Sequence, residues 1–271
     1  MMRDAVTTAA ACRPVHLDQA KLHLRVDADD EDALIASLVH AATDQVEYDT
    51  GRALVCQTRT LTLDRFPAGD VIIIPRPPLI EVVSVQYVDS AGTLQTVDAA
   101  DYETDTAEEP GRLYPAYGES WPSHRGAPDA VLVTYRAGYA TPVTVAQSTE
   151  VWTAAGRSLT DAAIIRLSNS GGALPAPMAA DTDYHVRDAS GATFKLAAAA
   201  AGAAIDVTDA GTGTHFIGQV PPALVQAILL LAGHWYAHRE AVVLGGSPTL
   251  LPAAVDRLTA LYRTWYVPER Q

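Results

Sequence analysis

His234 and His238 are the one pair of side chains in the chain whose spacing suits a metal ion. They stand four residues apart in a stretch that predicts a helix, so both rings would lie on one helix face. A zinc protease motif would need a glutamate directly after the first histidine, but Trp235 occupies that position, and no third ligand can be recognised. Histidines that pack or face solvent near a helix end explain the pair better, so we predict no metal.

No other group of residues predicts catalysis or a cofactor. His124, His185 and His215 fall in predicted loops or turns without an evident partner. Gly211-Thr-Gly213 lacks the third glycine and the following helix of a dinucleotide site, so turn formation explains these glycines better. Because no nucleophile is accompanied by a base and an orienting group, we expect neither an enzyme nor a bound cofactor.

One predicted helix lies near the start of the chain. An acidic run over 27–32 precedes apolar residues that recur at helical spacing from Leu34 to Val46, and Gly51 supplies a stop. We therefore expect a helix over about 30–50, whose dipole the acidic side chains complement. A calcium loop is the disfavoured alternative, because the acidic run lacks the central glycine and the distal glutamate.

The closing helices are the most apolar part of the chain. Over 223–240, one stripe comprises Leu224, Ile228, Leu231 and Trp235, and a second side comprises Val225, Leu229 and Tyr236. A helix that is apolar nearly all round must be buried on several sides. We expect the first stripe to face the chain's own core and the second side to face a neighbouring subunit. A last helix is expected over about 252–266, with one stripe formed by Val255, Leu258, Leu261, Tyr262 and Trp265.

Two stretches between these helices predict β-structure. Over 56–139 the side chains alternate with period two, Asp89-Ser-Ala-Gly92 reads as a hairpin turn, and a final strand is expected at Ala130 to Arg136. A second all-β module is expected over 141–219, with short strands at Val151, Ile164 to Leu167, Tyr184 to Arg187, Thr193 to Leu196 and Ala204 to Val207. Its aromatic residues Tyr184 and Phe194 form either its core, which we favour, or a sugar-binding face.

Composition bounds the class of protein. With 271 residues, 48% of them hydrophobic and 19% charged, the chain is expected to form two globular domains, with a single large β domain as the alternative. Its 19 basic and 32 acidic residues give a net charge of −13, which disfavours gripping nucleic acid; this charge suits either a wall that DNA slides past or simple solubility. Cys12 and Cys56 form no disulfide framework and are expected to be reduced. Without a signal sequence in Met1 to Val15 or a membrane-length apolar run, synthesis in the host cytoplasm is expected.

Short strings of residues form an ordered set over 16–140 and 220–266. The set includes Leu17-Asp-Gln-Ala-Lys-Leu-His-Leu24, Glu47-Tyr-Asp-Thr-Gly-Arg-Ala-Leu54, Pro75-Arg-Pro-Pro78, Val82-Val-Ser-Val85, Trp121-Pro122, Ala137-Gly-Tyr139, Gln226-Ala-Ile-Leu-Leu-Leu231 and His234-Trp-Tyr236. Together they resemble the head-to-tail connector (adaptor) family of tailed bacteriophages and gene-transfer agents. The resemblance implies a virion protein at the neck, forming a ring of about twelve copies between the portal and the next tail component, with DNA passing through the centre.

The expected architecture is α+β. A connector domain over 1–140 and 220–271 would pack N- and C-terminal helices with a small antiparallel β unit. The 141–219 module would be an insertion where the family usually has a short link. Strings such as Thr193-Phe-Lys-Leu196 look like a small β module of phage virion proteins. Its role is expected to be contact with neighbouring virion proteins, with a carbohydrate- or host-surface-binding protein as the alternative function.

The candidate sites in this chain are contact sites for assembly and not catalytic sites. The polar tail after the last helix is the candidate portal contact, and it comprises Val267, Pro268, Glu269, Arg270 and Gln271. The candidate subunit interface comprises Val225, Leu229 and Tyr236.

Overall fold

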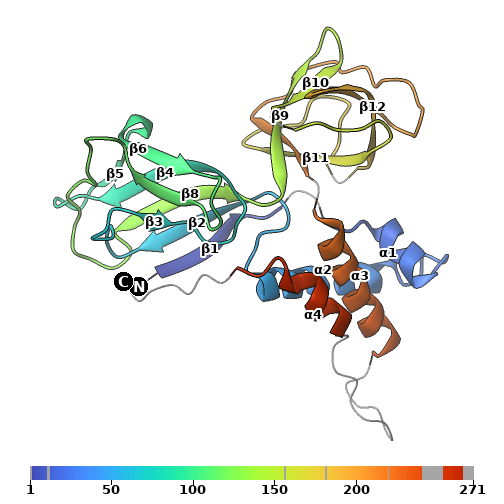
Figure 1. Cartoon of the computed structure of the whole chain (residues 1–271), viewed down its shortest axis with the longest axis horizontal. Helices are drawn as coiled ribbons and strands as arrows, with labels where there is room; N and C mark the ends of the chain where they lie inside the picture. Colours follow the sequence, from blue (N-terminus) through green and yellow to red (C-terminus); the bar gives the residue numbers. More distant parts are fainter. Residues whose placement is uncertain are drawn as a thin grey trace, which may run out of the picture.

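Three parts, each with its own hydrophobic core, make up the chain (Figure 1). The computed structural model describes residues 2–10, 13–155, 157–180, 182–218, 220–239 and 253–264. In Figure 1 a layer of helices lies at the lower right, two antiparallel sheets lie at the left, and a barrel stands above the helices. The predicted α+β class is thereby confirmed. Within the described residues, no helix is long and apolar enough to cross a membrane.

The helical layer contains α1 (Leu17–Leu24), α2 (Asp32–Thr50), α3 (Pro222–Ala237) and α4 (Ala253–Ala260). The helix predicted over about 30–50 is confirmed as α2, which ends at Gly51 with a φ of 70° and a bond from its N–H to the Glu47 carbonyl. The acidic residues before α2 make no side-chain cap on the helix. Instead, Asp29 and Asp32 bind Lys21 at 2.5 and 2.8 Å, which ties α1 to the start of α2.

The last helix is shorter than the sequence predicts. Its periodic stripe extends to Trp265, but α4 ends at Ala260, and a turn from the Tyr262 N–H to the Thr259 carbonyl follows. Beyond this end the helical phase no longer applies, so Leu261 is exposed instead of joining the stripe. Val255 is buried and Leu258 packs against the same core, as predicted.

The two sheets form the second part. The larger has the order β1-β2-β8-β4-β5, with bounds β1 Met2–Thr8, β2 Gln57–Leu63, β4 Leu79–Val88, β5 Leu94–Thr96 and β8 Val131–Ala137. The smaller has the order β3-β7-β6, with bounds β3 Ile72–Ile73, β6 Tyr102–Asp105 and β7 Arg112–Pro115; a short 3₁₀ helix, η1, spans Ala99–Asp101. The predicted hairpin turn is confirmed, because the Asp89 carboxylate accepts bonds from the N–H groups of Ala91 and Thr93.

The third part is a closed barrel with the order β10-β13-β12-β11-β14-β9. Its strands are β9 Ala140–Ala146, β10 Val151–Ala154, β11 Ile164–Ser170, β12 Tyr184–Ser190, β13 Thr193–Ala197 and β14 Thr214–Gly218. The strand predicted at Ala204 to Val207 is wrong: Ala204 makes only an isolated bridge to Ala197, and Val207 fills the barrel core. Strands β9 and β14, which were not predicted, pair with each other, and they join the barrel through β10 and β11 on their other sides.

The barrel begins and ends on neighbouring strands. Ala140, the first residue of β9, pairs with Gly218, the last residue of β14. Paired residues of antiparallel strands have Cα atoms only about 4.5–5.5 Å apart. The chain therefore enters and leaves the barrel at one point, beside the start of α3 (Figure 1).

Candidate assembly site

Helix α3 places the three candidate interface residues in different environments. Leu224, Ile228 and Leu231 are fully buried in the helical core, as the first stripe predicts. Leu229, predicted to face a neighbour, is only 6% exposed and belongs to the same core. Val225 and Tyr236 are half-buried at its margin.

The burial of Leu229 has a simple cause. Helix α3 contacts α1, α2 and α4, so its own chain covers more than one of its sides. The periodicity of the α3 sequence indicates which residues lie on the same side of the helix. It does not indicate how many other helices pack around α3. The expectation that a neighbouring subunit must supply the extra cover is thus wrong for Leu229. For Val225 and Tyr236 the subunit interface stays a prediction.

Tyr236 also has a polar function within the chain. Its hydroxyl donates to Glu31 next to α2, and Arg239 Nη2 binds the same carboxylate at 2.5 Å. These donors hold the pKa of Glu31 below its ordinary value of 4.5, with the Tyr236 hydrogen bond as the largest cause. The C-terminal end of α3 is therefore fastened to the N-terminal end of α2.

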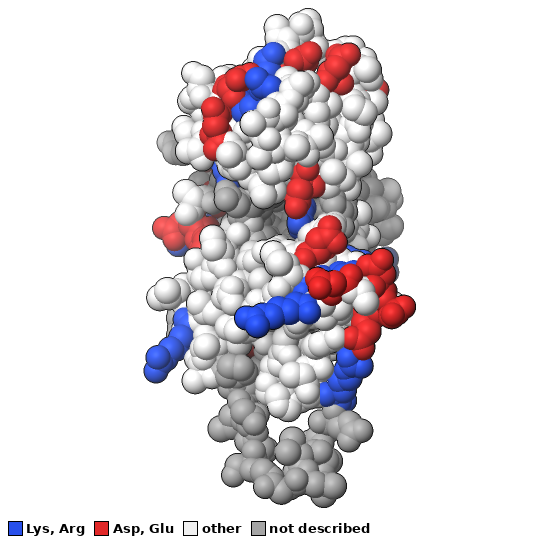
Figure 2. Space-filling model, turned by 90° about the vertical axis from the view of Figure 1, so that its right-hand side faces the viewer, with Lys and Arg blue, Asp and Glu red and all other residues white. Residues whose placement is uncertain are grey.

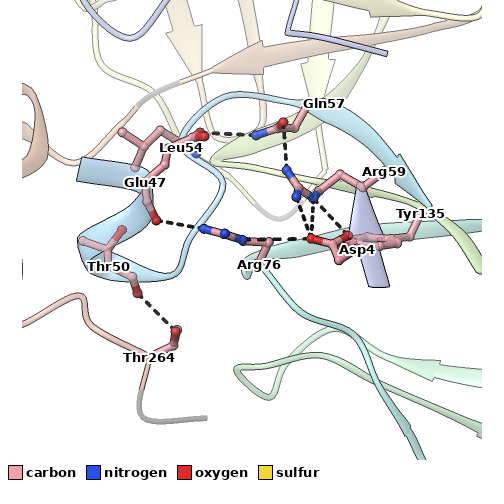
Figure 3. Close-up of polar contacts among 9 residues, drawn as sticks. All are labelled: Asp4, Glu47, Thr50, Leu54, Gln57, Arg59, Arg76, Tyr135 and Thr264. Atoms are coloured by element: carbon pink, nitrogen blue, oxygen red, sulfur yellow. Dashed lines mark hydrogen bonds and ion pairs between the residues drawn. The ribbon is translucent and has the colours of Figure 1, made fainter. Parts of the chain in front are cut away.

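The candidate portal contact over 267–271 lies outside the described residues, but the chain leading to it is anchored. The N–H of Thr264 donates to the Thr50 carbonyl at 2.9 Å, and its hydroxyl donates to the same oxygen at 3.1 Å (Figure 3). Arg52 Nε binds the Tyr262 carbonyl at 2.5 Å. Residues 262–264 are thereby fixed to the end of α2.

A buried polar network joins the first strand to the sheet (Figure 3). Asp4 of β1 receives Arg59 Nε at 3.0 Å and Nη2 at 2.6 Å, and Tyr135 of β8 donates its hydroxyl at 2.8 Å. The side chains of Asp4 and Arg59 are only 14% and 8% exposed. Burial is the largest cause that raises the pKa of Tyr135, and the Asp4 carboxylate adds to it. Asp4 therefore has donors from both β2 and β8, which connect the edge strand to two other strands of the sheet.

The network continues from the sheet into helix α2. Arg59 Nη1 donates to Gln57, and Gln57 Nε2 donates to the Glu47 carboxylate at 3.2 Å. The same carboxylate accepts the Leu54 N–H at 2.7 Å. Burial raises the pKa of Glu47 above its ordinary value of 4.5, and these donors only partly offset it. The sheet and the helical layer are thus joined through polar side chains.

An apolar groove lies where the barrel meets the helices. It has a volume of about 490 Å³ and is lined by residues that include Leu22, Leu54, Ile164, Ile165 and Val225. Leu22 of α1 and Ile164 of β11 are exposed although both are large and apolar. Arg166 spans the junction, since it binds Asp183 at 2.6 Å and the Arg13 carbonyl at 2.9 Å. Val225, the candidate interface residue, therefore opens onto this groove.

The residues first considered for chemistry have structural roles. The rings of His234 and His238 are 4.7 Å apart, but in the part of the chain that the structure describes no cluster of three ligand-type side chains surrounds a metal position. His124 packs edge-on against Phe66, and His215 contacts Asn169 and the Ala210 carbonyl.

The remaining residues of interest in the barrel and sheet are also accounted for. Tyr184 and Phe194 are buried, so the core interpretation is confirmed over the sugar-binding face. Cys56 is buried, and Cys12 lies outside the described residues. Gly211 and Gly213 have positive φ angles, as turn glycines do.

The geometry defines a class: an α+β protein with a helical layer, an antiparallel double sheet and a barrel, whose polar clusters fasten elements together. Residues 14–85 match the family model of phage gp6-like head-tail connector proteins. This segment includes α1, α2, β2, β3 and most of β4. The resemblance that the sequence strings predict is confirmed over these residues. No curated protein matches the chain.

Solved structures share the whole fold. A chain from the virion of a native gene transfer agent (GTA) particle is 20% identical, with a TM-score of 0.57 and with 97% of this chain and 96% of that chain covered. Chains from the necks of an empty GTA particle (C6 symmetry) and a native GTA particle (C12 symmetry) are each 19% identical, with TM-scores of 0.55 and 0.54 and full coverage of both chains. The alignment to the neck chains includes the barrel, so the barrel does not set this protein apart from them.

Proposed function

We propose that the protein is a structural head-to-tail connector of a phage-like particle, located in the virion neck. The match of residues 14–85 to the connector family model is the observation that carries this proposal. The fold shared with chains of GTA necks supports it, because that likeness includes all three parts of the molecule. In this role copies of the chain, about twelve by the family resemblance, form a ring between the portal and the next tail component.

Charge is consistent with DNA passing through such a ring. The chain has a net charge of −13, and acidic side chains gather on one part of the face drawn in Figure 2. Asp27, Asp29 and Asp30, which follow α1 in the sequence, are exposed. A surface of this sign repels the phosphate backbone, so DNA passes without being held. We assign no sequence-specific DNA contact to the protein.

The portal contact is assigned to the tail, Val267 to Gln271. It follows Thr264, whose two hydrogen bonds to Thr50 give the tail a defined starting point beside α2. Val225 and Tyr236 are assigned to the contact between subunits. The rival function, a carbohydrate- or host-surface-binding virion protein, loses one of its supports, because Tyr184 and Phe194 are core residues and do not form a sugar-binding face.

Mass photometry with and without purified portal tests the proposal. We expect the chain to give a closed ring on the portal, with a mass increase that is a whole multiple of 28.7 kDa. A chain that stays monomeric beside the portal, at concentrations where the portal itself is intact, would refute the connector function. Binding of a single copy would contradict the ring.

A further inference from the structure

Strand β1 is held to its own chain by few side chains. It forms one edge of the larger sheet and, among the described residues, pairs only with β2. Of its seven residues, Met2 and Asp4 are half-buried and the other five are exposed. The strand therefore depends on its backbone ladder and on the carboxylate of Asp4 for attachment.

The sheet presents a specific receptor for that carboxylate. Arg59 and Tyr135 point toward Asp4 from β2 and β8, and Arg76 Nε lies 4.0 Å from it (Figure 3). If β1 left, the Tyr135 hydroxyl would lose its acceptor and Arg59 would keep only Gln57, so these donors have all their partners only when an Asp4 carboxylate is present. The receptor thus requires a strand with an acid at this position. The β1 strand of any copy of the chain meets that requirement.

The connection from β1 to α1 permits the strand to reach another copy. Residues 9–16 join the two elements. Val15 is buried in the helical core and the Arg13 carbonyl accepts Arg166, so only residues 9–12 precede these anchored positions, and they can span roughly 13–14 Å when extended. A groove of about 490 Å³ lies between this connection and α2, lined by Ala9, Ala10, Arg13, His40 and Thr43 among others. Ala9 and Ala10, the first residues of the connection, are exposed and border this groove, whereas Val15 is already buried in the helical core.

We propose that β1 exchanges between neighbouring copies when the chain assembles. The β1 strand of one copy pairs with β2 of the next, and its Asp4 enters the Arg59–Tyr135 receptor of that copy. Each copy in a ring donates one strand and accepts one, so every contact is identical and every receptor is filled. This inference rests on the proposed ring function.

Cysteine pairs across β1 and β2 test the exchange. Ala5 and Thr60 are directly opposed, so Ala5→Cys and Thr60→Cys are made singly in a Cys12→Ser background, mixed, assembled on the portal and oxidised. Exchange predicts disulfide-linked dimers on a non-reducing gel. In the Ala5→Cys/Thr60→Cys double variant, oxidation of the dilute monomer links β1 to β2 of the same copy, so β1 cannot exchange. We expect this variant to fail to form rings and to recover when reduced.

The control is a disulfide that does not restrain β1. Thr60→Cys with Thr134→Cys links β2 to β8, whose residues are also opposed, and should form rings whether oxidised or reduced. If the oxidised Ala5/Thr60 variant forms rings like this control and the mixed single variants give no dimers, the exchange is overturned while the connector function stands. If the unmodified chain forms no ring on the portal, both the function and the exchange fail.

Discussion

Gly138 occupies the corner where the chain leaves β8 for the barrel. Its φ of 134° is rarely adopted by residues with a side chain, and an added Cβ would lie 2.4 Å from the carbonyl carbon of Val55. The N–H of Gly138 donates to the Pro78 carbonyl, and that of Tyr139 donates to the Leu54 carbonyl. The close backbone approach therefore places the barrel, the sheet and the end of the helical layer against one residue.

Replacement of this glycine should be costly. Gly138→Ala is expected to lower the free energy of unfolding by roughly 1–3 kcal/mol, because it combines an unfavourable φ with a backbone clash. Urea unfolding followed by circular dichroism measures the change. Gly126→Ala is the matched control, since no atom lies within 4 Å of its added Cβ, and it should stay within about 0.5 kcal/mol of the original chain. Equal effects of the two changes would contradict this account of the corner.

Glu47 gives the fold a pH dependence of defined sign. Its pKa is raised in the folded chain, mainly by burial, so its contribution to stability is complete below about pH 4.5 and is lost as the pH rises through the folded pKa. Glu47→Gln keeps an acceptor oxygen for Leu54 and cannot ionise. We expect the stability of this variant relative to the original chain to increase from pH 4.5 upward, as measured by urea unfolding at several pH values.

Glu31 supplies the opposite control. Its pKa is lowered by Tyr236 and Arg239, so its contribution is present above its ordinary pKa of 4.5 and disappears as the pH falls. Glu31→Gln should therefore lose stability near pH 7 and match the original chain at low pH. A Glu47→Gln variant with the same trend as Glu31→Gln would show that burial does not dominate at Glu47.

At the scale of the helices, a buried leucine and an exposed leucine should respond very differently to substitution. Leu229 of α3 is buried among α1, α2 and α4, whereas Leu261, just beyond α4, is 86% exposed. Leu229→Ala is expected to destabilise the chain by about 2–5 kcal/mol and Leu261→Ala by less than about 0.5 kcal/mol. Thermal unfolding of the two variants measures the difference. A small effect at Leu229 would restore it as a candidate contact between subunits.

The barrel is expected to be separable from the rest of the chain. Because Ala140 and Gly218 are paired neighbours, a short Gly/Ser linker in place of 141–218 bridges the same gap. The shortened protein should remain folded by circular dichroism and should still bind the portal in co-sedimentation. Insoluble product would instead indicate that contacts such as Arg136 over the Phe216 ring, 5.9 Å from its centroid, are needed for folding.

Elements with a regular pattern were predictable, and those that depend on distant partners were not. Helix α2 has an apolar face of helical period and a glycine stop, so local sequence is sufficient to predict it. Strand β1 has almost no buried face, so no alternation reveals it. The Asp4–Tyr135 hydrogen bond joins residues 131 positions apart, and a single sequence contains no signal for such a pair. Leu229 was misplaced because periodicity does not reveal how many neighbours a helix has.

At the scale of the whole molecule, we expect the tail to contribute to portal binding and not to the stability of the fold. Deletion of Val267 to Gln271 should leave the described cores intact, because Thr264 retains its bonds to Thr50. We expect unchanged thermal unfolding and loss of portal co-sedimentation. A truncated chain that binds the portal normally would remove the tail from the contact, and the search would turn to the groove beside Val225.

Because α2 and α3 lie far apart in the sequence, the three hydrophobic cores can form only in a certain order during synthesis. The sheets and the barrel are complete once Gly218 has been made, but the buried residues of α2 pack against Leu224 and Ile228, which follow both parts. At about 5–20 residues per second, the ribosome needs roughly 10–40 s to proceed from the end of α2 to the end of α3. Throughout that interval the apolar face of α2 lacks its partner. The helical layer, which contains much of the segment that matches the connector family, is therefore the last of the three cores to close.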